Sequence, residues 1–122
     1  MKNRTISFLR TSSRPIPRIL RMMKVGETLG LSPEFIGAYR ENNLPAQDTW
    51  EDITVKRVGT YYPMLNGKGV ASYLRGVWNF NRAAYKELQR STPAVVHVSD
   101  IESFGASFLY TLRHRSDTRL LY

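Results

Sequence analysis

The sequence predicts an α/β protein with a Rossmann-like, mostly parallel sheet that carries helices on both faces. Short β-forming runs alternate with longer stretches of helical periodicity, which is typical of this class. The run 93–100 is a short apolar strand that ends in polar groups, as strands do at the ligand-binding edge of such sheets. The composition, 42% hydrophobic and 11% aromatic over 122 residues, is that of one folding domain.

The first quarter of the chain predicts a strand, a loop and a basic helix. Residues 5–10 are rich in β-formers, and the two prolines within 11–17 indicate a loop. Pro17 suits the first turn of a helix that Gly30 would end. Apolar residues at helical spacing should face the core: Ile19, Met22, Met23, Gly26 and Leu29. Cations at similar spacings form one stripe on the other side: Arg14, Arg18, Arg21 and Lys24.

The middle of the chain predicts two more strands on either side of a long surface loop. Residues 33–40 read as the second strand, and 41–52 as the loop, because this stretch holds two asparagines and a proline. Residues 53–59 alternate well enough for a third strand, half exposed or near an edge of the sheet. An aromatic, apolar loop at 61–65 and a turn at 66–69 follow.

A long helix over 70–90 has the clearest pattern in the chain. The positions expected to face the core share one side, with Trp78 and Tyr85 beside them: Val70, Leu74, Val77, Asn81, Ala84 and Leu88. Its cations occupy a different face, so the helix is amphipathic and basic. We favour a core helix with a solvated outer face over a membrane contact.

The remaining residues predict a strand at 94–98, a helix over 101–114 and a last strand at 119–122. Ser99 or Asp100 can cap this helix. Its inward side is expected to hold Ile101, Phe104, Phe108, Leu109 and Leu112. A parallel strand without a following helix leaves one region of the sheet uncovered. We therefore expect residues 1–122 to form a single domain that is truncated after its last strand.

The positive charge is concentrated near the N-terminus. The net charge is +8, and the first 24 residues hold seven basic side chains and no acidic one. Such a cluster attracts anionic partners, namely phosphates, nucleic acids or acidic lipid surfaces. The chain has no cysteine, which excludes disulfides and thiolate metal sites. It also has no apolar stretch near the roughly 18 residues of a membrane span, so we expect a soluble protein.

Candidate binding residues follow two of the predicted strands. The loop after the first strand offers hydroxyls, backbone N–H groups and guanidinium groups at the start of a helix. An anion could bind there to Ser12, Ser13, Arg14 and Arg18. A plain connecting loop explains this sequence equally well. His97 and Asp100 lie at the carboxyl end of the strand 94–98. We favour a structural histidine at position 97.

Motifs of several enzyme classes are missing from the sequence. It contains no G-x-G-x-x-G, no P-loop and no G-x-S-x-G elbow, and its histidines and carboxylates do not cluster as metal ligands. We accordingly assign no catalytic residue, no metal and no cofactor to the chain itself.

Three stretches together resemble the N-terminal, acceptor-side domain of GT-B fold retaining glycosyltransferases, in particular the family 4-like enzymes. They are 13–19 with the helix through Gly30, 53–59 leading to Tyr61-Tyr62-Pro63, and 93–100, which is similar to the family's P-D-V-V-H-x-H-D strand. Where many members have a Gly-Gly pair after the first strand, this chain has Ser12-Ser13-Arg14-Pro15, and Ser99 replaces the frequent second histidine.

The resemblance implies the N-terminal half of a hexosyltransferase-like enzyme that moves a sugar from a nucleotide-sugar donor to a glycan or lipid-linked acceptor. It also implies a C-terminal donor-binding domain with an E-x7-E motif, which would lie beyond Tyr122. This chain alone is then expected to be inactive. Its expected location is cytoplasmic and peripheral at the membrane, with an anionic membrane surface as a further partner.

Two other functions stay open at this point. A non-catalytic basic module could bind nucleic acid, but the sequence has no reader motif and no aromatic residues interleaved with the basic ones, so we do not expect nucleic acid as a partner. A small flavodoxin-like regulator would need acidic groups after its first and third strands, where this chain has Ser/Arg/Pro and Tyr/Tyr/Pro.

Overall fold

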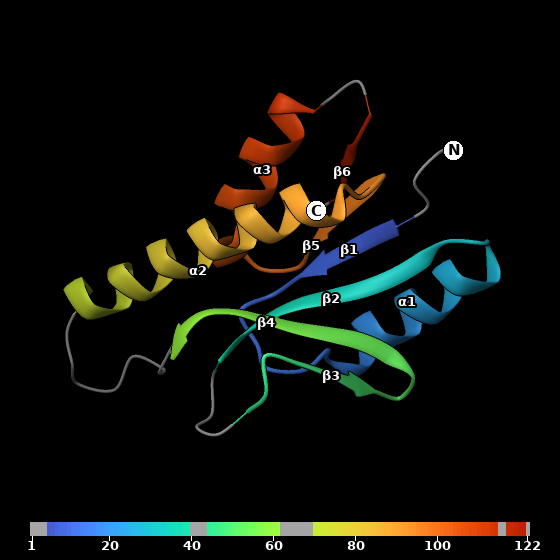
Figure 1. Ribbon diagram of the computed structural model, residues 1–122, viewed down its shortest axis with the longest axis horizontal. Coiled ribbons are helices and arrows are strands. Elements are labelled where there is room, and N and C mark those ends of the chain that lie inside the picture. The colour runs from blue at the N-terminus through green and yellow to red at the C-terminus, as the bar shows by residue number, and fades with distance from the viewer. Residues whose placement is uncertain (1–4, 40–43, 62–69, 115–116, 122) are drawn as a thin grey trace.

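The computed structural model describes residues 5–39, 44–61, 70–114 and 117–121, and Figure 1 shows their arrangement. The strands are β1 (Thr5–Leu9), β2 (Ser32–Tyr39), β3 (Gln47–Trp50), β4 (Ile53–Tyr61), β5 (Val95–Val98) and β6 (Arg119–Leu121). The helices are α1 (Pro17–Thr28), α2 (Val70–Ser91), the short 3₁₀ helix η1 (Ile101–Ser103) and α3 (Phe104–Arg113).

The strands form one sheet in the order β3-β4-β2-β1-β5-β6, in which β3 alone runs antiparallel to its neighbour. Helix α1 covers one face, and α2 and α3 cover the other (Figure 1). The chain moves outward from β1 to β2 and β4, then returns through α2 to β5 on the other side of β1. The switch point of this α/β sheet therefore lies between β1 and β5, as the predicted fold class requires.

Two apolar cores hold the layers together. On the α1 face, alternate strand residues such as Phe8, Phe35 and Val55 pack against Ile19 and Met23 of the helix. The other strand residues of the alternation point to the opposite face and pack there against α2 and α3. This second core contains Leu9, Ile36, Ala38, Phe80, Ala84, Leu88, Val96, Val98, Ala106 and Tyr110. Strands buried on both faces account for the short apolar runs in the sequence.

Helix α1 ends where the sequence predicted. Gly30 has a φ of 85°, a left-handed conformation that glycine adopts without a steric penalty. The N–H of Leu31 then returns to the carbonyl oxygen of Gly26 at 2.9 Å, which satisfies one of the last carbonyls of the helix. The predicted inward face was partly wrong, because Leu20 is buried while Met22 and Leu29 are exposed.

The predicted surface loop over 41–52 was wrong in its second half. Strand β3 pairs with β4 through a two-residue turn, Glu51-Asp52, in which both residues have positive φ. Positive φ at both central positions is what a tight hairpin needs to match the twist of its strands. The usual Asn-Gly or Asp-Gly signal is absent at this turn, which is why the sequence did not reveal it.

The inward faces predicted for the two later helices were also partly wrong. In α2 the buried residues are Phe80, Ala84 and Leu88, whereas the expected core residues Val70 and Leu74 are exposed. The first turns of α2 extend beyond the strands, so no sheet lies beneath them (Figure 1). In α3 the small and aromatic residues Ala106, Ser107 and Tyr110 face inward. Four apolar residues predicted to face inward are exposed instead: Ile101, Phe108, Leu109 and Leu112.

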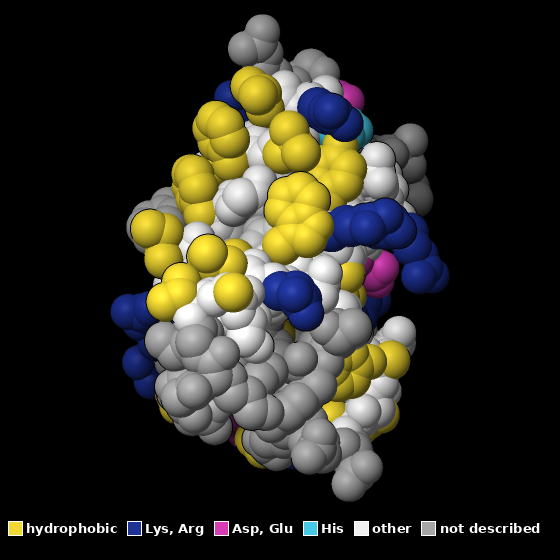
Figure 2. Space-filling model, turned by 90° about the vertical axis from the view of Figure 1, so that its left-hand side faces the viewer, with side chains coloured by type: hydrophobic (Ala, Val, Ile, Leu, Met, Phe, Trp, Pro, Cys, Tyr) yellow, Lys and Arg dark blue, Asp and Glu magenta, His cyan; other side chains and the backbone are white. Residues whose placement is uncertain are grey.

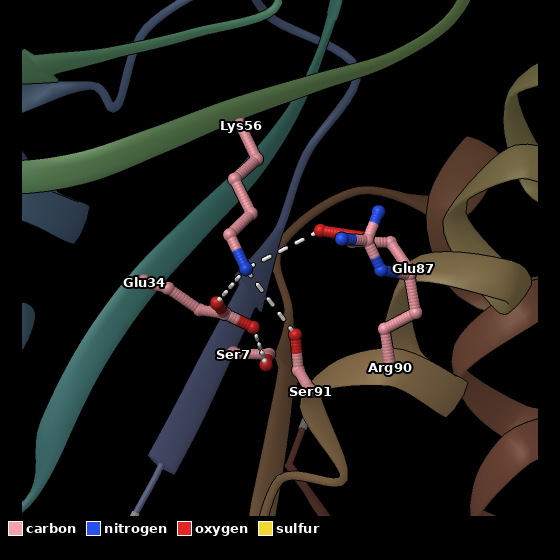
Figure 3. Close-up of polar contacts among 6 residues, drawn as sticks. All are labelled: Ser7, Glu34, Lys56, Glu87, Arg90 and Ser91. Carbon is pink, nitrogen blue, oxygen red and sulfur yellow. Dashed lines mark hydrogen bonds and ion pairs between the residues drawn. The ribbon is translucent and has the colours of Figure 1, made fainter.

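A partly buried charge cluster connects the end of α2 to the sheet, as Figure 3 shows. The Lys56 ammonium of β4 lies 2.9 Å from a carboxylate oxygen of Glu34 on β2 and 3.3 Å from one of Glu87 on α2. Ser7 on β1 donates a hydrogen bond to Glu34 at 2.7 Å. Burial by itself would lower the pKa of Lys56, but Glu34 and Glu87 outweigh it and raise the pKa above 10.5.

Candidate site at the carboxyl edge of the sheet

The candidate site lies at the switch point, where the chain leaves β1 and β5 at the same edge of the sheet. Leu9 at the end of β1 is paired with Val98 at the end of β5. The loop after β1 and the turn after β5 therefore meet, as the sequence predicted for the residues that follow Phe8 and Val96. The predicted turn and most of the apolar loop at 61–69 lie outside the described residues.

Asp100 joins these two segments. One carboxylate oxygen accepts hydrogen bonds from the backbone N–H and the hydroxyl of Thr11, at 2.9 and 2.7 Å. The other accepts from the N–H of Ser103 at 3.2 Å and from the Ser103 hydroxyl, and so caps η1. Asp100 is thus the predicted cap, and both of its oxygens are occupied by protein donors. Its role in the site is to hold the rim in shape.

The loop after β1 lies against the sheet and is fixed by its backbone. The carbonyl of Ser12 accepts a hydrogen bond from the N–H of Ala38 at 3.0 Å. The carbonyl of Ser13 accepts one from the Nε of Arg57 at 2.9 Å. This close approach requires Gly37, because a Cβ there would lie 2.3 Å from the Ser12 oxygen.

Arg57 is the functional residue that sequence reasoning missed. Its side chain is fully buried under the loop and also donates to the carbonyl of Pro45 at 3.0 Å and faces Asp48 at 3.2 Å. The only sequence signal was a cation at an inward position of an alternating strand, next to Lys56. Its two carbonyl partners come from loops, whose paths the alternation does not predict.

Arg14 is directed away from the switch point. Its guanidinium lies 4.8 Å from the ring centroid of Trp50 on β3, a cation–π contact. The strands β4, β2 and β1 lie between β3 and β5, so Arg14 and His97 are on different parts of the sheet. The hydroxyl of Ser12 donates to the carbonyl of Arg14 at 2.8 Å. Arg14 is therefore separated from His97, and anion binding by Ser12, Ser13, Arg14 and Arg18 stays a prediction.

His97 and Arg18 do influence each other. The His97 ring lies against Phe8 with centroids 5.0 Å apart, on the face that α1 covers. Burial lowers the pKa of His97 below 6.5, and the charge of Arg18 lowers it further. The Nδ1 atom is buried and has no hydrogen-bond partner among the described residues. His97 thus lies half-buried near the end of β5, and its lowered pKa favours the neutral imidazole.

Comparison with known proteins relates the fold to solved structures. No protein family and no curated protein sequence matches the chain significantly. Two structures of sucrose-phosphate synthase from Thermosynechococcus elongatus are similar, with TM-scores of 0.65 and 0.64 at 12% identity. The chain is covered to 95% and 97% and spans 60% and 32% of those chains.

A third solved structure is similar over the same part of the chain. It is a trehalose-6-phosphate protein from E. coli bound with UDP-2-fluoro glucose, with a TM-score of 0.54 at 12% identity. It is matched over 95% of this chain and 32% of its own length. These similarities establish the fold, an α/β architecture that the chain shares with part of each of these larger proteins.

The helices were also compared with the requirements of a membrane span. Within residues 5–39, 44–61, 70–114 and 117–121, none combines the length and apolar character needed to cross a bilayer.

Proposed function

We propose that residues 1–122 form the N-terminal, acceptor-side domain of a GT-B fold glycosyltransferase. The observation that carries this proposal is the rim at the switch point, where hydrogen bonds from Thr11 to Asp100 join the loop after β1 to the turn that follows His97 and β5. The similar proteins support it, because one of them holds a sugar nucleotide. The finer assignment to retaining, family 4-like enzymes comes from the resemblance of the run 93–100.

The proposed roles follow from the chemistry of each group. A neutral imidazole can donate or accept one hydrogen bond, which suits an acceptor hydroxyl. The Arg18 guanidinium suits a phosphate or another anion on the same acceptor. Asp100 keeps the two segments together and touches no ligand. The nucleotide-sugar donor would bind to a C-terminal domain with the E-x7-E motif. Residues 1–122 by themselves would therefore not transfer sugar.

The proposed reaction transfers a hexose to a glycan or lipid-linked acceptor in the cytoplasm. No metal or cofactor enters it besides the nucleotide-sugar donor. The rim groups support an acceptor that carries both hydroxyls and negative charge, as a sugar phosphate or a lipid-linked phosphate does.

A titration followed by NMR tests the acceptor assignment. Glucose 6-phosphate should shift the amide signals around Arg18 and His97, whereas UDP-glucose alone should leave them in place. The variants Arg18→Gln and His97→Gln should each weaken binding of the sugar phosphate at least tenfold, because each removes one polar partner. The matched control, Arg21→Gln, changes an exposed cation one turn further along α1 and should bind normally. Shifts caused only by UDP-glucose, or by neither compound, would contradict the proposal.

The exposed cations of α1 favour one alternative, a basic module that binds nucleic acid. Arg18, Arg21 and Lys24 are all exposed on this helix. Such a module would bind DNA or RNA with an affinity that falls steeply with salt. A steep salt dependence that Arg21→Gln weakens would favour this alternative, and absence of binding removes it.

A further inference from the structure

The face formed by α2 and α3 carries an apolar patch that the sheet does not use. We define the α2–α3 patch as the exposed large apolar residues of these helices and η1: Val70, Leu74, Trp78, Ile101, Phe108, Leu109 and Leu112. Trp78 is 68% and Ile101 76% exposed, so these side chains are largely open to solvent. Figure 2 shows apolar side chains gathered on the upper part of this side of the molecule. Monomeric proteins seldom expose so many large apolar residues together unless the face binds something.

A groove between the two helices runs through this patch. Its volume is about 750 Å³, and Leu74, Val77, Trp78 and Leu109 line its apolar part. The small residues Gly105 and Ala106 of α3 also line the groove. The surface of the groove is mainly apolar, with charged side chains at its border, which suits hydrocarbon better than a sugar.

Cations flank the patch and have no acidic partner among the residues that the structure describes. Arg82 and Lys86 of α2 line the groove, and Arg75 is exposed on the same helix. None of the three forms an ion pair with another described side chain. The described acid nearest in sequence on this helix, Glu87, is turned to Lys56 in the buried cluster. The charge around the patch therefore complements an anionic surface.

We infer that the α2–α3 patch is a docking surface for a membrane with anionic lipids. Exposed tryptophan and leucine side chains would enter the region between head groups and acyl chains, while the flanking cations would meet lipid phosphates. A solvated outer face, which the sequence predicts for this helix, does not account for exposed apolar residues among cations that form no ion pair with a described side chain. This inference does not depend on sugar transfer, because it concerns a different face from the pair His97 and Arg18.

Vesicle binding tests the surface directly. The protein should sediment with phosphatidylcholine vesicles that contain about 30 mol% phosphatidylglycerol and much less with phosphatidylcholine alone. In a Trp50→Phe background, the emission of Trp78 should shift to the blue on binding, because the indole leaves water. Leu74→Ser with Trp78→Ser should weaken binding at least tenfold. The matched control, Leu29→Ser, alters a 74% exposed residue at the C-cap of α1, on the opposite face, and should bind normally.

The charge contribution has its own pair of variants. Arg82→Gln with Lys86→Gln should weaken binding to the anionic vesicles by roughly fivefold per charge. Arg21→Gln with Lys24→Gln on α1 is the control and should have little effect. All substituted residues are exposed, so circular dichroism should show an unchanged fold.

Several outcomes would overturn the inference. One is the absence of binding to anionic vesicles. Another is an equal loss of vesicle affinity in the charge variants of α1 and α2, which would mean that the cations of α1 also contact the membrane. A dimer in sedimentation that Leu74→Ser with Trp78→Ser dissolves, without any vesicle binding, would instead assign the patch to contacts between copies of this chain.

Discussion

Two consecutive cations on β4, the partly buried Lys56 and the fully buried Arg57, lie on opposite faces of the sheet and have different roles. Lys56 faces α2 and is held by the carboxylates of Glu34 and Glu87. Arg57 faces α1 and is held mainly by the carbonyls of Ser13 and Pro45. Because strand side chains alternate, one strand positions both a helix and the loop of the candidate site. The charge of Lys56 therefore connects a helix to the sheet, whereas the charge of Arg57 holds a loop, and substitutions can separate these two roles.

Removing the Lys56 charge should have the largest effect. Lys56→Met would leave the carboxylates of Glu34 and Glu87 without their cation, at a cost of about 3 kcal/mol in the free energy of unfolding, the lower end for a buried pair because Lys56 is partly exposed. Urea denaturation measures this loss. Glu34→Gln with Glu87→Gln should recover much of it in the Lys56→Met background, because no buried charge then remains unpaired. The exposed control Lys86→Met should change stability little. A cost for Lys56→Met as small as that of the control would show that the cluster is not a unit.

Substitution of Arg57 should affect the loop more than the helices. Arg57→Lys keeps the charge but loses the planar fork that reaches Ser13 and Pro45 together, and should cost about 2 kcal/mol for one lost hydrogen bond to a charged group. Amide exchange should then accelerate at Ser12 to Arg14, while the amides of α2 stay protected. Faster exchange in α2 as well would contradict the division of roles between the two cations.

Alkaline pH should weaken the α2 face. The folded pKa of Lys56 lies above 10.5, so its contribution is complete below that pH and is lost as the pH rises through the folded value. Burial also raises the pKa of Tyr110, so the ionisation of this tyrosine likewise lowers the free energy of unfolding as the pH rises. The urea midpoint should therefore fall from about pH 10 upward, and less steeply in Lys56→Met and in Tyr110→Phe. An equal slope in all three proteins would contradict this assignment.

Local signals predicted the parts of the fold that depend on neighbours in sequence. Pro17 and Gly30 bounded α1, and Asp100, one of the two predicted caps, caps the short helix after β5. The faces of α2 and α3 were less predictable, because each helix carries apolar residues on more than one side. Which side is buried depends on where the sheet ends beneath the helix, as the exposed Leu74 shows.

The candidate site was predictable in position and less so in its contacts. The carboxyl ends of β1 and β5 were expected to meet, and the contact between Thr11 and Asp100 follows from that topology. The turn of Arg14 toward Trp50 and the role of Arg57 depend on how a loop crosses the sheet. Sequence periodicity carries no information about such a path, although Gly37 inside a strand is a signal of close backbone approach.

Acid pH should produce the smallest effect, at the candidate site. The folded pKa of His97 is below 6.5, so its contribution to stability is present above that pH and is lost as the pH falls through the folded value. NMR titration of the imidazole should report this low pKa, and Arg18→Gln should move it upward because one repelling charge is gone. The urea midpoint should also decline less toward low pH in His97→Gln. A His97 pKa that Arg18→Gln leaves unchanged would mean that burial alone sets it, and the two residues would then not form one anion- and hydroxyl-binding pair.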